Sequence, residues 1–249
     1  MSWYPVERIR RLERYIAEGF PTIWSQSVPA AMWLTQRYDV ALHARGIDGA
    51  VAEIGVLRGA FIIGLTQLLP DKASSLAIDC FDTSGYELEL PGDRAVLGEY
   101  LANVGRWAYG PEAAGYIAAN SGTLNPVEVA REYGRVFKFF AVDGLHTENQ
   151  TLHDLRIAEA ALVPGGMIIL DDWKDGCQPV VAAAEAFIAD GRFAPVAYGF
   201  NKLWLAQNEY VDVYQTIRFY PRCRLIEIAG RTVPQVGPSD PYNPGEWFN

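Results

Sequence analysis

Two stretches of the sequence decide the fold: residues 136–146 are VFKFFAVDGLH, and residues 163–172 are VPGGMIILDD. The first is almost wholly apolar over 136–142, as expected of a strand that helices cover on both faces. In the second, residues 167–170 form another apolar run. Leucines at helical spacing predict a helix over 148–162, which the Pro-Gly-Gly sequence at 164–166 would end. Strand, helix and strand in this order predict a βαβ unit with parallel strands.

The same alternation extends along the chain in both directions. It predicts an α/β, Rossmann-like, doubly wound and mostly parallel sheet. A closing antiparallel hairpin and an N-terminal helical extension would complete the fold. The expected strands cover 50–54, 75–80, 115–119, 136–142, 167–170, 193–196 and 202–206, and the expected helices cover 5–18, 30–45, 60–69, 126–133, 148–162 and 178–189.

Three segments are expected in the chain. Residues 1–47 would form the helical extension, residues 48–209 the ligand-binding domain, and residues 210–249 a C-terminal extension with an aromatic, Pro-rich tail. Within that extension, residues 230–249 have four prolines and are expected to be loop-like. The terminal extensions are also candidates for contacts in a homo-oligomer.

Composition narrows the class of protein. Half of the 249 residues are hydrophobic, which suits a globular core and excludes a disordered chain. The net charge of −9, with no extended basic run, argues against a nucleic-acid partner. No signal peptide and no apolar run of about 20 residues is found, so no membrane partner is expected. Three widely spaced cysteines favour a reducing, cytoplasmic location.

Polar residues follow the apolar run at four of the expected strand ends. These are Glu53-Ile54-Gly55, Asp79, Asp143-Gly144-Leu145-His146 and Asp171-Asp172. Any one of them is explained by a helix cap or a turn. Because ligands of open α/β sheets bind outside the carboxyl ends of the strands, all four together predict a binding site at one edge of the sheet.

The first two strand ends favour a nucleoside ligand. Gly55 and Gly59 have the spacing GxxxG, not the GxGxxG that cradles a dinucleotide. Gly55 would let the backbone turn sharply and approach a ligand, and Gly59 would let the next helix start near the strand. Asp79 can accept hydrogen bonds from both ribose hydroxyls, with Asp82 as a close rival.

The last two strand ends predict a cation site. Asp143, Asp171 and Asp172 would bring three carboxylates together, and their repulsion is relieved by a divalent cation such as Mg²⁺, Ca²⁺ or Mn²⁺. Loop capping by Asp143 and Asp172 is the alternative. His146 is either a general base for a hydroxyl group or a residue that orients the substrate or the loop. Lys202 either reaches the site from the final hairpin or is a solvated strand lysine, and the second is favoured.

The ordered motifs resemble a class I S-adenosylmethionine (SAM)-dependent methyltransferase. Val142–His146, Asp154, Leu162–Gly166 and Asp171-Asp172 are similar to the macrocin-type small-molecule O-methyltransferases. The resemblance implies that residues 48–209 bind SAM. It implies methionine-end contacts from Glu53, Gly55 and Gly59, a ribose contact from Asp79, adenine contacts from Asn120 and Ser121, and a cation, Mg²⁺ above all, that holds the acceptor at Asp143, Asp171 and Asp172.

The expected function is methyl transfer from SAM to a hydroxyl oxygen of a small molecule, such as a sugar, a phenol or another natural product. Asp143 and His146 are the candidate catalytic residues, with SAM and a divalent cation as cofactors. Three alternatives stay open: a metal-independent methyltransferase with His146 as base, a non-catalytic SAM-binding scaffold, and an NAD-dependent oxidoreductase, which the missing GxGxxG disfavours.

Overall fold

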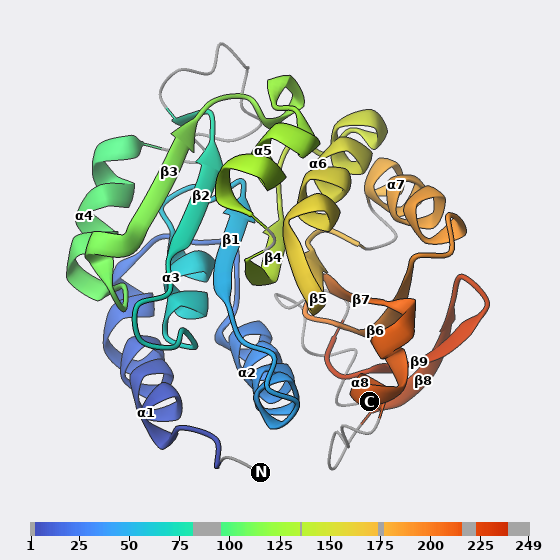
Figure 1. Cartoon of the computed structure of the whole chain (residues 1–249), viewed down its shortest axis with the longest axis horizontal. Helices are drawn as coiled ribbons and strands as arrows, with labels where there is room; N and C mark the ends of the chain where they lie inside the picture. The colour runs from blue at the N-terminus through green and yellow to red at the C-terminus, as the bar shows by residue number, and fades with distance from the viewer. Residues whose placement is uncertain (1–2, 82–95, 135, 174–176, 216–222, 239–249) are drawn as a thin grey trace.

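The computed structural model describes residues 3–81, 96–134, 136–173, 177–215 and 223–238. These residues form one sheet in the order β3-β2-β1-β4-β5-β7-β6-β9-β8 (Figure 1). Its parallel half consists of β1 (Ala50–Ile54), β2 (Ser75–Asp79), β3 (Ala114–Ala118), β4 (Phe137–Val142) and β5 (Leu162–Leu170). The other half consists of β6 (Phe193–Gly199), β7 (Lys202–Gln207), β8 (Arg224–Ile228) and β9 (Arg231–Gln235).

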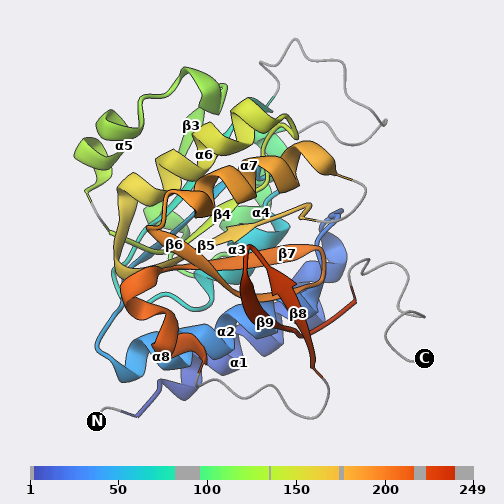
Figure 2. The same cartoon turned by 90° about the vertical axis from the view of Figure 1, so that its right-hand side faces the viewer.

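Helices cover both faces of the sheet (Figure 2). One face carries α5 (Pro126–Tyr133), α6 (Glu148–Ala161) and α7 (Gln178–Ala189), and the other carries α1 (Val6–Arg14), α2 (Pro29–Ala44), α3 (Ala60–Thr66), α4 (Leu97–Trp107) and α8 (Val211–Gln215). The strands supply side chains to both cores by alternation: Val51 packs in one core and Ala52 and Ile54 in the other. The predicted doubly wound sheet and its closing hairpin, β6–β7, are confirmed.

The sequence led us to expect that the Pro-Gly-Gly segment would separate a helix from a strand, but it does not. It lies inside β5, which begins at Leu162. Leu162 pairs with Phe137 on β4, and the register shifts between Phe137 and Phe139. Gly165 has a φ of 82°, a conformation that glycine adopts without strain. The segment is therefore an irregular start to the strand, because glycine accommodates the bulge there.

The prediction of a loop over 230–249 is wrong for residues 231–235, which form β9. This strand pairs antiparallel with β8 and meets β6 at Tyr198 and Gln235. Val233 is buried in the sheet core, and this burial outweighs the proline at position 234. Residues 239–249 of the predicted tail lie outside the described part of the chain. The expected domain limits at 47 and 209 remain predictions.

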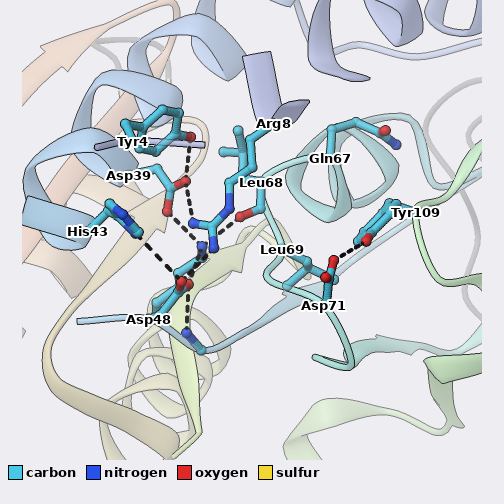
Figure 3. Close-up of polar contacts among 12 residues, drawn as sticks. Tyr4, Arg8, Asp39, His43, Asp48, Gln67, Leu68, Leu69, Asp71 and Tyr109 are labelled. Atoms are coloured by element: carbon cyan, nitrogen blue, oxygen red, sulfur yellow. Dashed lines mark hydrogen bonds and ion pairs between the residues drawn. The ribbon is translucent and has the colours of Figure 1, made fainter. Parts of the chain in front are cut away.

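A largely buried group of charges fixes the N-terminal helices to the sheet (Figure 3). Arg8 of α1 contacts Asp39 of α2 at 3.1 Å and Asp48 at 2.5 Å. Lys138 of β4 contacts the same two carboxylates at 2.6 and 2.8 Å. Two positive and two negative groups balance within this N-terminal ion cluster (Arg8, Asp39, Asp48 and Lys138). None of the described helices is long and apolar enough to cross a membrane.

Candidate functional site

A cavity of about 540 Å³ opens at the carboxyl ends of β1, β2, β3 and β4. That volume is in the range typical of small-molecule sites. Its lining contains seven of the residues that the sequence analysis selected: Glu53, Gly55, Asp79, Asn120, Ser121, Asp143 and His146. Gly59, Asp171 and Asp172 are not among the residues that line it.

Gly55 and Gly59 have positive φ angles of 81° and 87°. The space beside Gly55 is filled by protein, because a Cβ there would lie 1.7 Å from the carbonyl oxygen of Asp143. A Cβ on Gly59 would meet the ring of Tyr100 on α4 at 2.9 Å. The nearest neighbours of these two glycines are thus another strand-end loop and another helix, in addition to any ligand that they approach.

Asp79 holds two strand-end turns together. Its Oδ2 accepts the N–H of Leu57 at 3.0 Å, and its Oδ1 accepts the N–H of Phe81 at 2.9 Å. Both of these residues have positive φ angles. Burial raises the pKa of Asp79, although these backbone hydrogen bonds oppose the shift. A third backbone group, that of Val56, also stabilises the carboxylate, which has about four acceptor positions in all. The rival Asp82 lies outside the described residues.

Glu53 brings a carboxylate to the floor of the cavity. Its side chain is buried, and Oε2 has no hydrogen-bond partner among the described residues. Burial, together with the charges of Asp143 and Asp171, raises the pKa of Glu53 well above its ordinary value. A buried polar atom without a partner indicates a missing ligand or water. A cationic ligand group at this position would satisfy Oε2 and restore the carboxylate charge.

Two residues that the sequence analysis did not place in the site support the loop after β3. Gln150 of α6 donates from Nε2 to the hydroxyl of Ser121 at 2.8 Å and to Asp154 at 2.9 Å. Burial raises the pKa of Asp154 to about 6. Asn120 caps the following turn by accepting the N–H of Gly122 at 2.9 Å. A polar residue in the first turn of a helix is a weak signal, so the sequence alone did not single out Gln150.

Lys202 is buried, contrary to the prediction of a solvated lysine. The β6–β7 turn places it there: Phe200 and Asn201 have φ angles of 55° and 65°, as in a two-residue type I′ hairpin. Lys202 donates to Asp171. Burial raises the pKa of Asp171 to about 7, although Lys202 opposes that shift. Asp171 therefore has a protein cation as its partner.

The predicted group of three carboxylates is replaced by Asp143, His146 and Asp172, which lie together. His146 Nε2 is 2.9 Å from Asp172 and 3.6 Å from Asp143. Asp172 also accepts a hydrogen bond from Asn201 at 2.6 Å and has a φ of 55°, which is strained for a non-glycine residue. Hydrogen bonds to Asp143 and Asp172 raise the pKa of His146 to about 11. The imidazolium thus offsets one of the two acid charges at neutral pH.

The remaining wall of the cavity comes from the N-terminal extension, which the sequence analysis left without a function. Residues 24–27 line it, next to Arg58. The guanidinium of Arg58 lies 5.0 Å from the centre of the Trp24 ring and 2.5 Å from Glu99. No motif marks this segment, so the sequence alone could not assign it to the site.

Comparison with known proteins agrees with this geometry. Residues 52–173 match a family model described as a methyltransferase domain. The O-methyltransferase NovP has a similar structure, with a TM-score of 0.56 and 16% identity over 71% of this chain and 79% of that one. An O-methyltransferase from Bacillus cereus, solved in complex with SAH, gives a TM-score of 0.54 and 14% identity over 80% of this chain and 90% of that one. No curated protein matches the chain.

Proposed function

Since the chain carries a class I SAM-dependent methyltransferase domain, we propose that it transfers the methyl group of SAM to a hydroxyl oxygen of a small molecule. One observation carries the proposal: a single cavity joins Glu53, Asp79 and the loop after β3 to the Asp143–His146 loop. The first three provide partners for an amino-acid end, a ribose and an adenine. The last provides proton acceptors beside the expected point of transfer.

Bound SAM would supply a methyl group activated by its sulfonium charge. The protein then has to align donor and acceptor and to remove the hydroxyl proton. Asp79 would hold the ribose, and Glu53 would attract the ammonium group. Asp143, His146 and Asp172 together would take the proton. We include both acids because His146, with its pKa raised to about 11, already carries a proton at neutral pH.

We also propose a divalent cation, with a ligand set that differs from the one expected from the sequence. Asp143, His146 and Asp172 each offer one ligand atom, and these atoms lie within 4.8 Å of one another. They would hold the cation, with His146 neutral, and the cation would lower the pKa of an acceptor hydroxyl. Asp171, which the sequence analysis included in the ligand set, is engaged by Lys202 instead.

The test is to incubate the protein with SAM and simple phenols, catechols or glycosides and to measure S-adenosylhomocysteine (SAH) and methylated product. We expect product from at least one hydroxyl acceptor. His146→Ala should lower turnover while SAH affinity, measured by calorimetry, changes little. SAH binding without turnover on any acceptor would favour the scaffold alternative, and no SAH binding would contradict the proposal.

The same assay examines the cation. We expect EDTA to lower turnover and Mg²⁺ or Mn²⁺ to restore it, with SAH affinity unchanged, and Asp172→Ala to reproduce the chelated state. Full turnover after thorough chelation would show that Asp143, His146 and Asp172 act without a metal. In that case turnover should rise with pH as His146 loses its proton, and His146→Ala should abolish this rise.

A further inference from the structure

Gln150, in the first turn of α6, lines the end of the cavity that lies beyond β3. Asn120 and Ser121, which follow β3, line the same end. In the sheet, β3 is next to β2, which ends at Asp79, and β1, which carries Glu53, lies on the other side of β2. If Asp79 holds the ribose of a nucleoside ligand and Glu53 its charged end, the base extends toward β3. Gln150 is therefore placed to contact the base.

Both hydrogen-bond donors of the Gln150 amide are used within the protein. Nε2 donates to the hydroxyl oxygen of Ser121 at 2.8 Å and to Oδ1 of Asp154 at 2.9 Å. The nitrogen of a side-chain amide has two N–H groups and no more. The carbonyl oxygen, Oε1, is therefore the atom of the amide that remains for a ligand, and this atom can only accept a hydrogen bond. A ligand group that bonds to Gln150 must be a donor.

Asp154 determines which way the amide of Gln150 faces. It is fully buried, and its pKa of about 6 leaves it ionised above neutral pH. An ionised carboxylate only accepts hydrogen bonds, so an amide turned the other way would place two acceptors against each other. Gly122 leaves room for the other side of the amide, because a Cβ at this position would lie 2.3 Å from Gln150 Oε1. The protein thus holds the amide in one orientation.

We infer that Gln150 Oε1 accepts a hydrogen bond from the exocyclic amino group of adenine and thereby selects adenine over a base with an oxo group at the same position. The inference rests on the proposed function, because it takes the ligand to be SAM. The oxo group of hypoxanthine is an acceptor and would face a second acceptor in Oε1. A site built to bond a donor strongly rejects a ligand that lacks it. Gln150 is thus a specificity-determining residue that α6, and not a strand end, supplies.

The experiment compares two ligands by calorimetry at about pH 8, where Asp154 is ionised. SAH carries adenine, and S-inosylhomocysteine is the same molecule with an oxo group in place of the exocyclic amino group. We expect the wild type to prefer SAH by more than about tenfold. Gln150→Leu should reduce this preference about tenfold, because SAH loses its acceptor while S-inosylhomocysteine loses none.

Asn149→Leu is the matched control, because it removes an amide from the neighbouring, exposed position of α6, which does not line the cavity. It should leave both affinities unchanged. Thermal unfolding shows whether each variant is folded, and Gln150→Met gives a second test with a side chain of similar length. Equal weakening of both ligands by the two Gln150 variants, an unchanged preference, or equal binding of both ligands by the wild type would overturn the inference. If the wild type binds neither ligand, the proposed function fails instead.

Discussion

Gly55 shows how one backbone position governs two strand ends. Its φ of 81° requires a conformation that side chains disfavour, and the carbonyl of Asp143 occupies the place of a Cβ. The loop after β1 and the loop after β4 therefore pack directly against each other. A substitution at Gly55 would move the Asp143 loop, so its effect on ligand binding would follow from its effect on the fold.

We expect Gly55→Ala to lower the free energy of unfolding by more than about 2 kcal/mol, because backbone strain and a steric clash combine. Gly46→Ala is the matched control: Gly46 has a φ of 71°, but a Cβ at this position would have open space for 4 Å around it. It should lose only about 1 kcal/mol. Urea denaturation measures both, and equal losses would show that the Asp143 carbonyl moves aside easily.

Asp154 should make stability depend on pH. Folding raises its pKa from 3.8 to about 6 by burial, so the folded protein binds this proton more tightly than the unfolded chain. The resulting stabilisation is complete below pH 3.8 and is lost as the pH rises through 6. The shift corresponds to at most about 3 kcal/mol. The stability of Asp154→Asn relative to wild type should therefore be greater at about pH 8 than at about pH 5.

Chemical denaturation at the two pH values checks this expectation. Asp212→Asn, at an exposed position on α8, serves as the control and should leave the pH dependence unchanged. If wild type and Asp154→Asn show the same pH dependence of stability, folding does not raise the pKa of Asp154.

At the scale of elements, the β6–β7 hairpin completes the site. Its two-residue turn brings Asn201 to Asp172 and Lys202 to Asp171. β7 pairs antiparallel with β5, with Leu203 opposite Leu170. The amide of Asn201 and the ammonium group of Lys202 therefore contact the two acids that follow β5. The hairpin thus neutralises part of the charge that the parallel strands concentrate at this edge.

We expect Lys202→Met to lower stability by about 3 kcal/mol or more, because it leaves the buried Asp171 without its counter-charge. In the double variant Lys202→Met with Asp171→Asn, much of that loss should be recovered, since no unpaired charge remains. Thermal and urea unfolding of the two single variants and the double variant give the coupling energy. Additive effects would contradict a direct interaction between the two side chains.

The sequence was sufficient to predict the parallel half of the sheet. Its strands are short, mostly apolar runs with a polar residue in the run or close to its end, and that pattern is local. Lys202 was misjudged because its burial depends on a hairpin turn and on Asp171, which lies elsewhere in the chain. β9 was missed because Pro234 favours a loop, and its burial arises only from the strands beside it. Residues 24–27 were missed because no local pattern indicates that they line the cavity.

At the scale of the molecule, the N-terminal ion cluster ties the extension to the centre of the sheet. Lys138 is a fully buried residue of a central strand, and Asp39 on α2 is equally buried. Burying three of these charges, with Asp48 half-buried, costs solvation free energy, which good geometry offsets. The extension is thereby held in one position relative to β4. Residues 24–27 of the extension depend on that position to line the cavity.

We expect Arg8→Met to lower the free energy of unfolding by about 3 kcal/mol, because Asp39 and Asp48 lose one of their two cations. SAH affinity should fall as well, since residues 24–27, which line the cavity, follow α1 in the chain. Arg10→Met is the matched control, because Arg10 pairs with Glu7 at the surface and such pairs contribute little. If the two variants behave alike, the cluster does not anchor the extension.

The contact between Asp39 and Lys138 spans 99 residues of the chain. During synthesis, Arg8, Asp39 and Asp48 therefore emerge long before their lysine. Parallel pairing of β1 with β4 must wait for the same stretch of chain, whereas the β6–β7 hairpin forms from adjacent residues. Non-local pairing of this kind slows folding, and hairpins close within microseconds. Until β4 is made, Asp39 and Asp48 have only Arg8 of the cluster's two cations, which would delay the docking of the extension.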